Sequence, residues 1–303
     1  MELRDLRYLA VLGSELHFGR AAARLHMTQP ALSQALARLE REIGCPLLQR
    51  DTRGASLTEA GRVLLAETEG VLRTVDLACD LARRAGRGEI GEVTIGFVDA
   101  AVFDILPPLL RAFRQRYPAV NVTSRQMKAA ELVEGVKAGQ LDLAITRRDG
   151  SGDEVEYLPL RRERLGLAVS LANPLASAPD VAVADLAAEQ FIIPVIEGVP
   201  SLHGLWLDLC HDAGFEPHIS AHISSIQVLI ELIANDIGVA FAAESWTHNT
   251  PGVVVKPLRG TNEYIEVGVA YRPRQLPGAA RNLLEMALRM AERREPGGLP
   301  GAA

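Results

Sequence analysis

The sequence has few cysteines and no long apolar run. Its three cysteines lie far apart, at positions 45, 79 and 210, which is not the spacing of a disulfide framework. No apolar stretch reaches the length of a membrane span, and residues 1–16 contain acidic side chains where a signal peptide would have none. We therefore expect a cytoplasmic protein in a reducing compartment, with no membrane partner.

The sequence also lacks the short motifs of common enzymes. No G-x-S-x-G, Walker loop or GxGxxG stands at a strand–helix junction. The seven histidines are scattered. His218 and His222 share an expected strand, but at roughly 3.3 Å per residue they are ~13 Å apart, too far to share a metal. We expect no enzyme activity, no metal site and no cofactor.

The net charge of −6 is divided unevenly along the 303 residues. Residues 1–57 contain eight arginines and six acidic side chains, whereas most of the negative charge lies beyond residue 86. A basic N-terminal part favours contact with phosphate groups, and the acidic remainder needs no such contact. The length, with 48% hydrophobic residues, is enough for two or three domains.

The N-terminal part has the pattern of a winged helix-turn-helix. Hydrophobic spacing predicts a helix over 3–14, Phe18 in the loop after it, and a second helix beginning at Gly19. A third helix follows, with Thr28 as its N-cap and Pro30 in its first turn. A buried stripe and a short basic hairpin complete the pattern. The stripe consists of Leu32, Leu36 and Leu39, and the hairpin contains Arg50, Arg53 and Gly54.

The exposed face of the third helix is the part that we expect to read DNA. The first turns of a recognition helix usually meet base edges, where Gln bonds adenine and Ser bonds a base or a phosphate. Arginines nearby are expected to contact phosphates and position the protein. The expected DNA-binding residues are Thr28, Gln29, Pro30, Ser33, Gln34, Arg38, Arg50 and Arg53. The alternative is a structural helical hairpin with a solvated charged face.

A proline-free run continues from Thr58 to about Arg84 and predicts one long helix, ~40 Å at 1.5 Å per residue. Its apolar stripe consists of Leu64, Val71, Val75, Ala78 and Ala82. A small domain cannot cover such a stripe, so we expect a homodimer that presents two recognition helices to an inverted repeat. The alternative is that the helix packs on its own chain. Residues 85–88 resemble a hinge.

Short motifs in the first sixty residues resemble those of the LysR-type transcriptional regulators. They are F-x-R-A-A-x-x-L at 18–25, T-Q-P-A-L-S at 28–33, L-E-x-E-I-G at 39–44, P-L-L-x-R at 46–50 and L-T-E-A-G at 57–61. Leu48 stands where the family usually has Phe, an apolar exchange that changes packing rather than contacts. The resemblance implies an effector-responsive regulator that forms a homotetramer, and it allows RNA polymerase as a partner.

Beyond residue 92, short β-branched runs alternate with amphipathic helices, which predicts an α/β fold with parallel βαβ units. The resemblance implies a two-lobed, periplasmic-binding-protein-like effector domain. The expected organisation is a winged helix-turn-helix over 1–57, a linker helix and hinge over 58–88, an effector-binding domain over 89–295 and a flexible tail over 296–303. The first lobe would comprise 89–161 and 267–295, and the second lobe 162–266.

Ligands of such open sheets bind beyond the carboxyl ends of strands, at helix N-termini. With the resemblance, this gives an effector cleft at Asp99, Ala100, Ala101, Met127, Lys128, Arg147, Ser201, His203, Ser224 and Ser225. Lys128 and Arg147 favour an anion, such as an aromatic or dicarboxylic acid. Because Asp99 would repel that anion, either it pairs with Lys128 or Arg147, or the ligand carries a donor such as an amine or hydroxyl. Ordinary caps and solvated charges are the alternative for each residue.

Two functions remain open at this point. The first is a DNA-binding transcriptional regulator that responds to a small molecule. The second is a small-solute-binding protein to which the N-terminal part adds only oligomerisation, and the lack of a secretion signal disfavours it. Cys210 alone falls in the expected effector domain, which excludes an internal switch disulfide there. Cys45 and Cys79 are expected to pack as small apolar groups.

Overall fold

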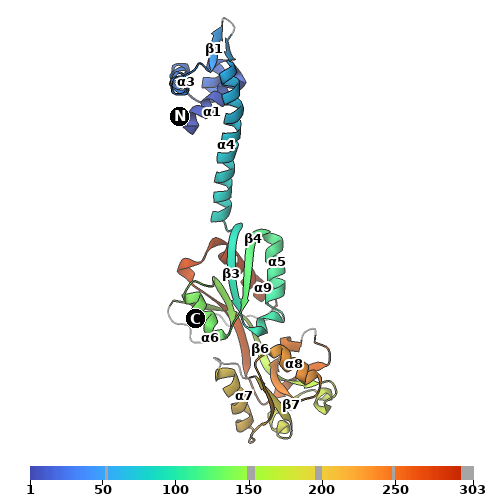
Figure 1. Cartoon of the computed structure of the whole chain (residues 1–303). Coiled ribbons are helices and arrows are strands. Elements are labelled where there is room, and N and C mark those ends of the chain that lie inside the picture. The colour runs from blue at the N-terminus through green and yellow to red at the C-terminus, as the bar shows by residue number, and fades with distance from the viewer. Residues whose placement is uncertain (52–53, 149–153, 195–199, 248–249, 295–303) are drawn as a thin grey trace. The chain divides into compact units, whose positions relative to one another are not determined.

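The computed structural model describes residues 1–51, 54–148, 154–194, 200–247 and 250–294. The chain divides into two compact units, Met1–Arg84 and Ala85–Ala303 (Figure 1). Among the described residues, no helix is both long and apolar enough to cross a membrane. The tail expected over 296–303 lies outside the described residues.

The N-terminal unit begins with three helices and a hairpin. These are α1 (Leu3–Glu15), α2 (Phe18–Arg24), α3 (Gln29–Ile43), β1 (Leu48–Asp51) and β2 (Gly54–Leu57), with β1 and β2 antiparallel. Phe18 is not in a loop: it is the first residue of α2 and is buried. The helix begins one residue earlier than expected because the ring of His17 acts as its N-cap, with Nδ1 accepting from the backbone N–H groups of Gly19 and Arg20.

Helix α3 has the capped start and the buried stripe that the sequence predicts. The hydroxyl of Thr28 accepts the backbone N–H of Ala31, and Pro30 lies in the first turn. Leu32, Leu36 and Leu39 are buried in one core with α1 and α2. The opposite face of α3 is therefore presented to solvent.

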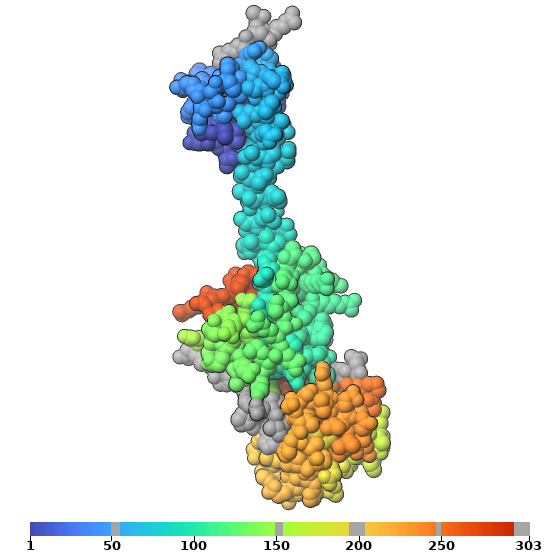
Figure 2. Space-filling model, in the orientation of Figure 1, coloured from blue at the N-terminus to red at the C-terminus, as the bar shows by residue number. Residues whose placement is uncertain are grey.

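Helix α4 (Glu59–Gly86) follows, and the hydroxyl of Thr58 accepts the backbone N–H of Gly61 at its start. Four large apolar side chains along this helix, Val63, Val71, Leu77 and Leu81, are between 40% and 59% exposed. In Figure 2 its middle turns form a narrow column with no other segment over the visible face. The described part of the N-terminal unit thus leaves much of the apolar surface of α4 exposed.

The C-terminal unit contains a long mixed sheet with the strand order β4-β3-β5-β12-β6-β11-β7. Its first lobe has the parallel strands β3 (Ile90–Phe97), β4 (Ala119–Gln126) and β5 (Leu143–Thr146). The helices of this lobe are α5 (Leu106–Arg116), α6 (Ala129–Lys137) and α9 (Gly278–Arg294). Side chains of α5 and α9 share one buried core with β3 and β5, so the last helix does return to the first lobe.

The second lobe has the strands β7 (Val181–Ala182), β8 (Gln190–Pro194), β9 (His218–Ile223), β10 (Ala240–Ala243) and β11 (Val253–Arg259). Its helices are α7 (Pro200–Asp212) and α8 (Ile226–Ala234). The lobes are joined by β6 (Glu156–Ser170) and β12 (Tyr264–Tyr271), which pair antiparallel along the full length of β12. The sequence predicted parallel units only, but β12 also runs antiparallel to β5.

A buried polar cluster lies where β6 passes between the lobes. The guanidinium of Arg161 forms ion pairs with Asp104, which precedes α5, and with Glu163. Its Nη2 also donates to the hydroxyl of Ser245 at 2.8 Å, and that hydroxyl donates to Glu163 at 2.7 Å. Ser245 belongs to the short helix η4 (Glu244–Thr247) of the second lobe. The cluster therefore links both lobes to the same strand.

Candidate functional site

The exposed face of α3 carries most of the side chains expected to contact DNA. Thr28, Gln29, Pro30 and Gln34 are exposed, and Ser33 is half-buried. Beside them, α1 and α3 form an open groove of about 450 Å³ that Gln34, Arg38 and Arg41 line together with Arg4 and Tyr8. The groove combines cationic and amide side chains next to a capped helix N-terminus.

Arg38 is also bound within the unit. Its Nη2 lies 2.6 Å from Oδ1 of Asp5, a side chain that is only 3% exposed, while Arg38 itself is 50% exposed. The backbone N–H of Glu2 donates to the other carboxylate oxygen of Asp5. Arg38 is therefore held at the edge of the groove rather than free in solvent, which the sequence did not indicate.

The wing is described only in part. Arg50 lies in β1, where its backbone is paired with Ala55 of β2. The side chain of Arg50 and all of Arg53 lie outside the described residues.

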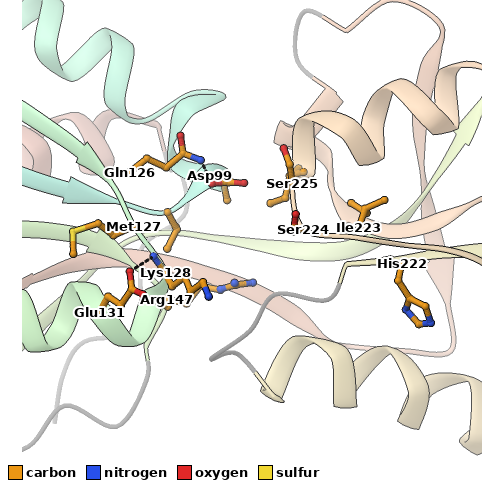
Figure 3. Close-up of a pocket in the computed structure, with 14 residues that line it drawn as sticks. Asp99, Gln126, Met127, Lys128, Glu131, Arg147, His222, Ile223, Ser224 and Ser225 are labelled. Carbon is orange, nitrogen blue, oxygen red and sulfur yellow. Dashed lines mark hydrogen bonds between the residues drawn. The ribbon is translucent and has the colours of Figure 1, made fainter.

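A cleft of about 800 Å³ opens between the two lobes (Figure 3). One wall comes from the ends of β3 and β4 and from the start of α6, and the other from the end of β9 and the start of α8. The lining includes seven of the expected residues: Asp99, Ala100, Met127, Lys128, Arg147, Ser224 and Ser225. In the first lobe, the parallel strands β3, β4 and β5 bring the loops of Asp99, Met127 and Arg147 together, because their carboxyl ends meet at one edge of the sheet.

One expected residue, Ala101, does not line the cleft, and two others lie outside the described side chains. Ala101 is fully buried in the core of the first lobe, because the 3-10 turn η1 (Asp99–Val102) directs it inward. Ser201 and His203 lie in the first turns of α7, and their side chains are outside the described part of the chain.

Asp99 is held by an amide. The Nε2 of Gln126, the last residue of β4, donates to Oδ1 of Asp99, the first residue of η1 (Figure 3). The sequence offered Lys128 or Arg147 as partners of this carboxylate. The register of the parallel strands explains the difference, because it sets Gln126 opposite Phe97, two residues before Asp99.

The cationic side chains lie on the same lobe as Asp99. Lys128 precedes α6, and its backbone N–H donates to the carboxylate of Glu131 at 3.4 Å, while Arg147 directly follows β5 and is half-buried. Across the cleft, Ser225 is the N-cap of α8, but its hydroxyl makes no capping hydrogen bond. The charged side chains of the first lobe thus face a wall that contains Ser224 and Ser225 together with His222, Ile223 and Ile226.

The sequence did not indicate seven of the lining residues: Val98, Gln126, Ala129, Glu131, His222, Ile223 and Ile226. All but Glu131 stand within two residues of an expected position, so a wider window at each strand end would have included them. Glu131 lies one helical turn into α6, where the 3.6-residue period returns a side chain toward the cleft.

Among the described residues, possible metal ligands are not clustered, and Cys79 and Cys210 differ in exposure. No group of three or more His, Cys, Asp or Glu side chains could hold a metal ion there. Burial, and secondarily the charge of Glu216, raises the pKa of the Cys210 thiol to about 11. Cys79 is exposed on α4 rather than packed as an apolar group, because the single chain leaves that face uncovered.

Both parts of the chain match known protein families. Residues 3–62 match the family model of the bacterial regulatory helix-turn-helix proteins of the lysR family, and residues 86–292 match the LysR substrate binding domain. The HTH-type transcriptional regulator AlsR of Bacillus subtilis (strain 168) is 35% identical over 245 residues, 81% of each chain.

Solved structures agree with these matches. The crystal structure of CbnR, a LysR family transcriptional regulator, has a TM-score of 0.82 and 27% identity, covering 95% of this chain and all of CbnR. Full-length CbnR in complex with its target DNA gives a TM-score of 0.80 at 27% identity, covering 96% of this chain and all of that one.

Proposed function

The chain belongs to the LysR family of transcriptional regulators, and from this premise we propose that a small charged molecule in the cleft controls how it binds DNA. It is a DNA-binding regulator with a substrate-binding domain, and it is not an enzyme. The finer proposal concerns which residues contact the DNA and the effector, and how the two events are coupled.

One observation supports this proposal above the others: an exposed helix face and a charged cleft lie in separate compact units of one chain. A solute-binding protein would need the cleft but not an exposed, capped α3 beside a cationic groove. The proposed DNA contacts are those expected from the sequence, with Arg38 acting from its ion pair with Asp5.

The proposed assembly is a homodimer through α4, and a homotetramer made of two such dimers. Exposed Val71, Leu77 and Leu81 support it, because a second copy of the helix would cover them. Two copies would address the half-sites of an inverted repeat. We further propose a cytoplasmic regulator, with RNA polymerase as a partner at the promoter.

We keep the proposed divisions of the chain after residues 57 and 88. Thr58 caps α4, which supports the first division. Gly88 has a φ of +67° just beyond the helix, which supports the second as a hinge. The proposed lobe limits, near 161 and 267, fall within β6 and β12, so both lobes share these strands.

A gel-shift titration tests this function. We expect the full chain to bind the DNA upstream of its own gene with sequence preference, and more weakly as salt rises. Small carboxylic acids that raise its melting temperature should alter the mobility or affinity of that complex. Lys128→Gln should abolish the response to the acid and retain DNA binding, whereas Lys137→Gln, on the outer side of α6, should retain both. A chain that shows no sequence preference at any ionic strength contradicts the proposal.

A further inference from the structure

An acidic side chain, Asp99, lies in the lining of the cleft. Asp99 is half-buried at the first residue of η1, directly after the buried end of β3. The amide of Gln126 donates to one of its oxygens and orients the carboxylate (Figure 3). Because an amide is neutral, this hydrogen bond leaves the negative charge of Asp99 in place.

The charges around the described cleft are balanced. Its lining contains two cationic side chains, Lys128 and Arg147, and two carboxylates, Asp99 and Glu131. In Figure 3, Asp99 faces Ser225 across the gap, whereas Arg147 extends into the gap beside Lys128. Along this wall Asp99 thus lies apart from Lys128 and Arg147, whereas Glu131 lies beside Lys128 and accepts its backbone N–H.

A plain anion would fit only half of this arrangement. A ligand carboxylate near Arg147 gains a charge-assisted hydrogen bond, but Asp99 repels it in a cleft that is partly shielded from water. A ligand with a cationic amine at its other end removes that repulsion and gains a second charge-assisted bond. About 800 Å³ is ample room for such a molecule.

We propose that the effector is a zwitterion, with a cationic amine bound by Asp99 and an anionic group bound by Arg147 and Lys128. Gln126 positions the Asp99 carboxylate, and the hydroxyl of Ser225 accepts from the amine across the cleft. Closure of the second lobe over the amine would then couple ligand binding to the shape of the C-terminal unit. This inference rests on the proposed function and names the ligand class of the same cleft.

The test uses the full chain and matched pairs of probes that differ by one amino group: L-glutamate and glutarate, 4-aminobutyrate and butyrate, 5-aminovalerate and valerate. Thermal shift ranks the pairs, and calorimetric titration measures the affinities. We expect the aminated member to bind wild-type protein more tightly. Asp99→Asn should weaken the binding of the aminated member by about tenfold or more, which is the loss of affinity expected for one charge-assisted hydrogen bond.

The same variant should strengthen binding of the deaminated member, because the repulsion is gone. Glu134→Gln, on the exposed side of α6, is the matched control and should change neither affinity. Tighter wild-type binding of the deaminated members, or no binding of any aminated member, overturns the zwitterion. In the first case a deaminated acid that still alters the gel shift leaves the proposed function standing. If Asp99→Asn weakens the binding of both members of a pair equally, the zwitterion proposal is also overturned.

Discussion

The guanidinium of Arg38 lies 2.6 Å from the buried carboxylate of Asp5, so an ion pair joins the first helix of the N-terminal unit to the proposed reading helix. Burial alone would raise the pKa of Asp5. The hydrogen bonds from Arg38 and from the backbone of Glu2, with the positive charges of Arg38 and Arg4, outweigh burial and lower that pKa. The pair therefore stabilises the unit while Asp5 is ionised.

Asp5→Asn should lower the free energy of unfolding by about 1 kcal/mol at neutral pH, because the amide loses the charge-assisted bond to Arg38. A carboxyl whose pKa is lowered on folding stabilises above its unfolded pKa of about 4 and loses that effect as pH falls through its folded pKa. When denaturation is measured from pH 7 to pH 3, the difference in free energy of unfolding between variant and wild type should thus shrink below about pH 4. Asp80→Asn, exposed on α4, serves as the control, and a gap that is constant with pH contradicts this linkage.

Gln34→Ala should relax base preference on DNA, because the exposed amide lies at the part of α3 that is proposed to meet base edges. A loss of about 1–3 kcal/mol in discrimination at one base position is the expected size. Selection from a randomised half-site library measures it. Gln115→Ala on α5 should leave the preferred DNA sequence unchanged. Arg53→Ala should lower the affinity for all DNA sequences by the same factor. Identical profiles for Gln34→Ala and Arg53→Ala would refute the assignment.

Gly61→Ala should destabilise the N-terminal unit by about 2 kcal/mol or more, as overpacking does. An added Cβ would lie 2.0 Å from the carbonyl oxygen of Leu47, where α4 begins against the wing. Gly70→Ala in the same helix meets nothing within 4 Å and should stabilise it by about 0.5–1 kcal/mol through helix propensity. Thermal unfolding of both variants checks this, and a loss of stability in Gly70→Ala equal to that in Gly61→Ala would show the prediction wrong.

Arg161→Met should lower the stability of the C-terminal unit by about 3 kcal/mol, because it removes a guanidinium from between two mostly buried carboxylates. Chemical denaturation followed by tryptophan fluorescence reports on this unit, since Trp206 and Trp246 both lie in the second lobe. Arg164→Met, exposed three residues further along β6, should cost much less. Comparable losses in both variants would mean that the cluster contributes little.

The elements with local signals were predictable. Thr28 and Thr58 mark helix starts by their own side chains, and the apolar stripe of α3 has a clear helical period. The fold class of the C-terminal unit follows from the alternation of strands and helices. These features depend on residues within one or two turns of each other.

The features that depend on distant residues were not predictable in the same way. The first half of β6 has no local strand signal, because Arg161, Arg162 and Glu163 interrupt its apolar pattern, and partners distant in the sequence accommodate charges such as that of Arg161. The bond between Gln126 and Asp99 spans 27 positions and depends on the pairing register of β3 and β4. The ion pair of Asp5 likewise depends on a distant residue, because its partner Arg38 lies 33 positions away on α3.

Strands β6 and β12 remain hydrogen-bonded to each other as they pass between the lobes, with a register shift between Val267 and Gly268. A flexible tether would let two lobes swing freely, but a paired ribbon yields mainly by twisting, and an irregular register is where twist concentrates. A ligand bound in the cleft would then rotate one lobe relative to the other by a small angle, through twisting of the paired strands. We expect the backbone to change most at the register shift between Val267 and Gly268, away from the ligand itself.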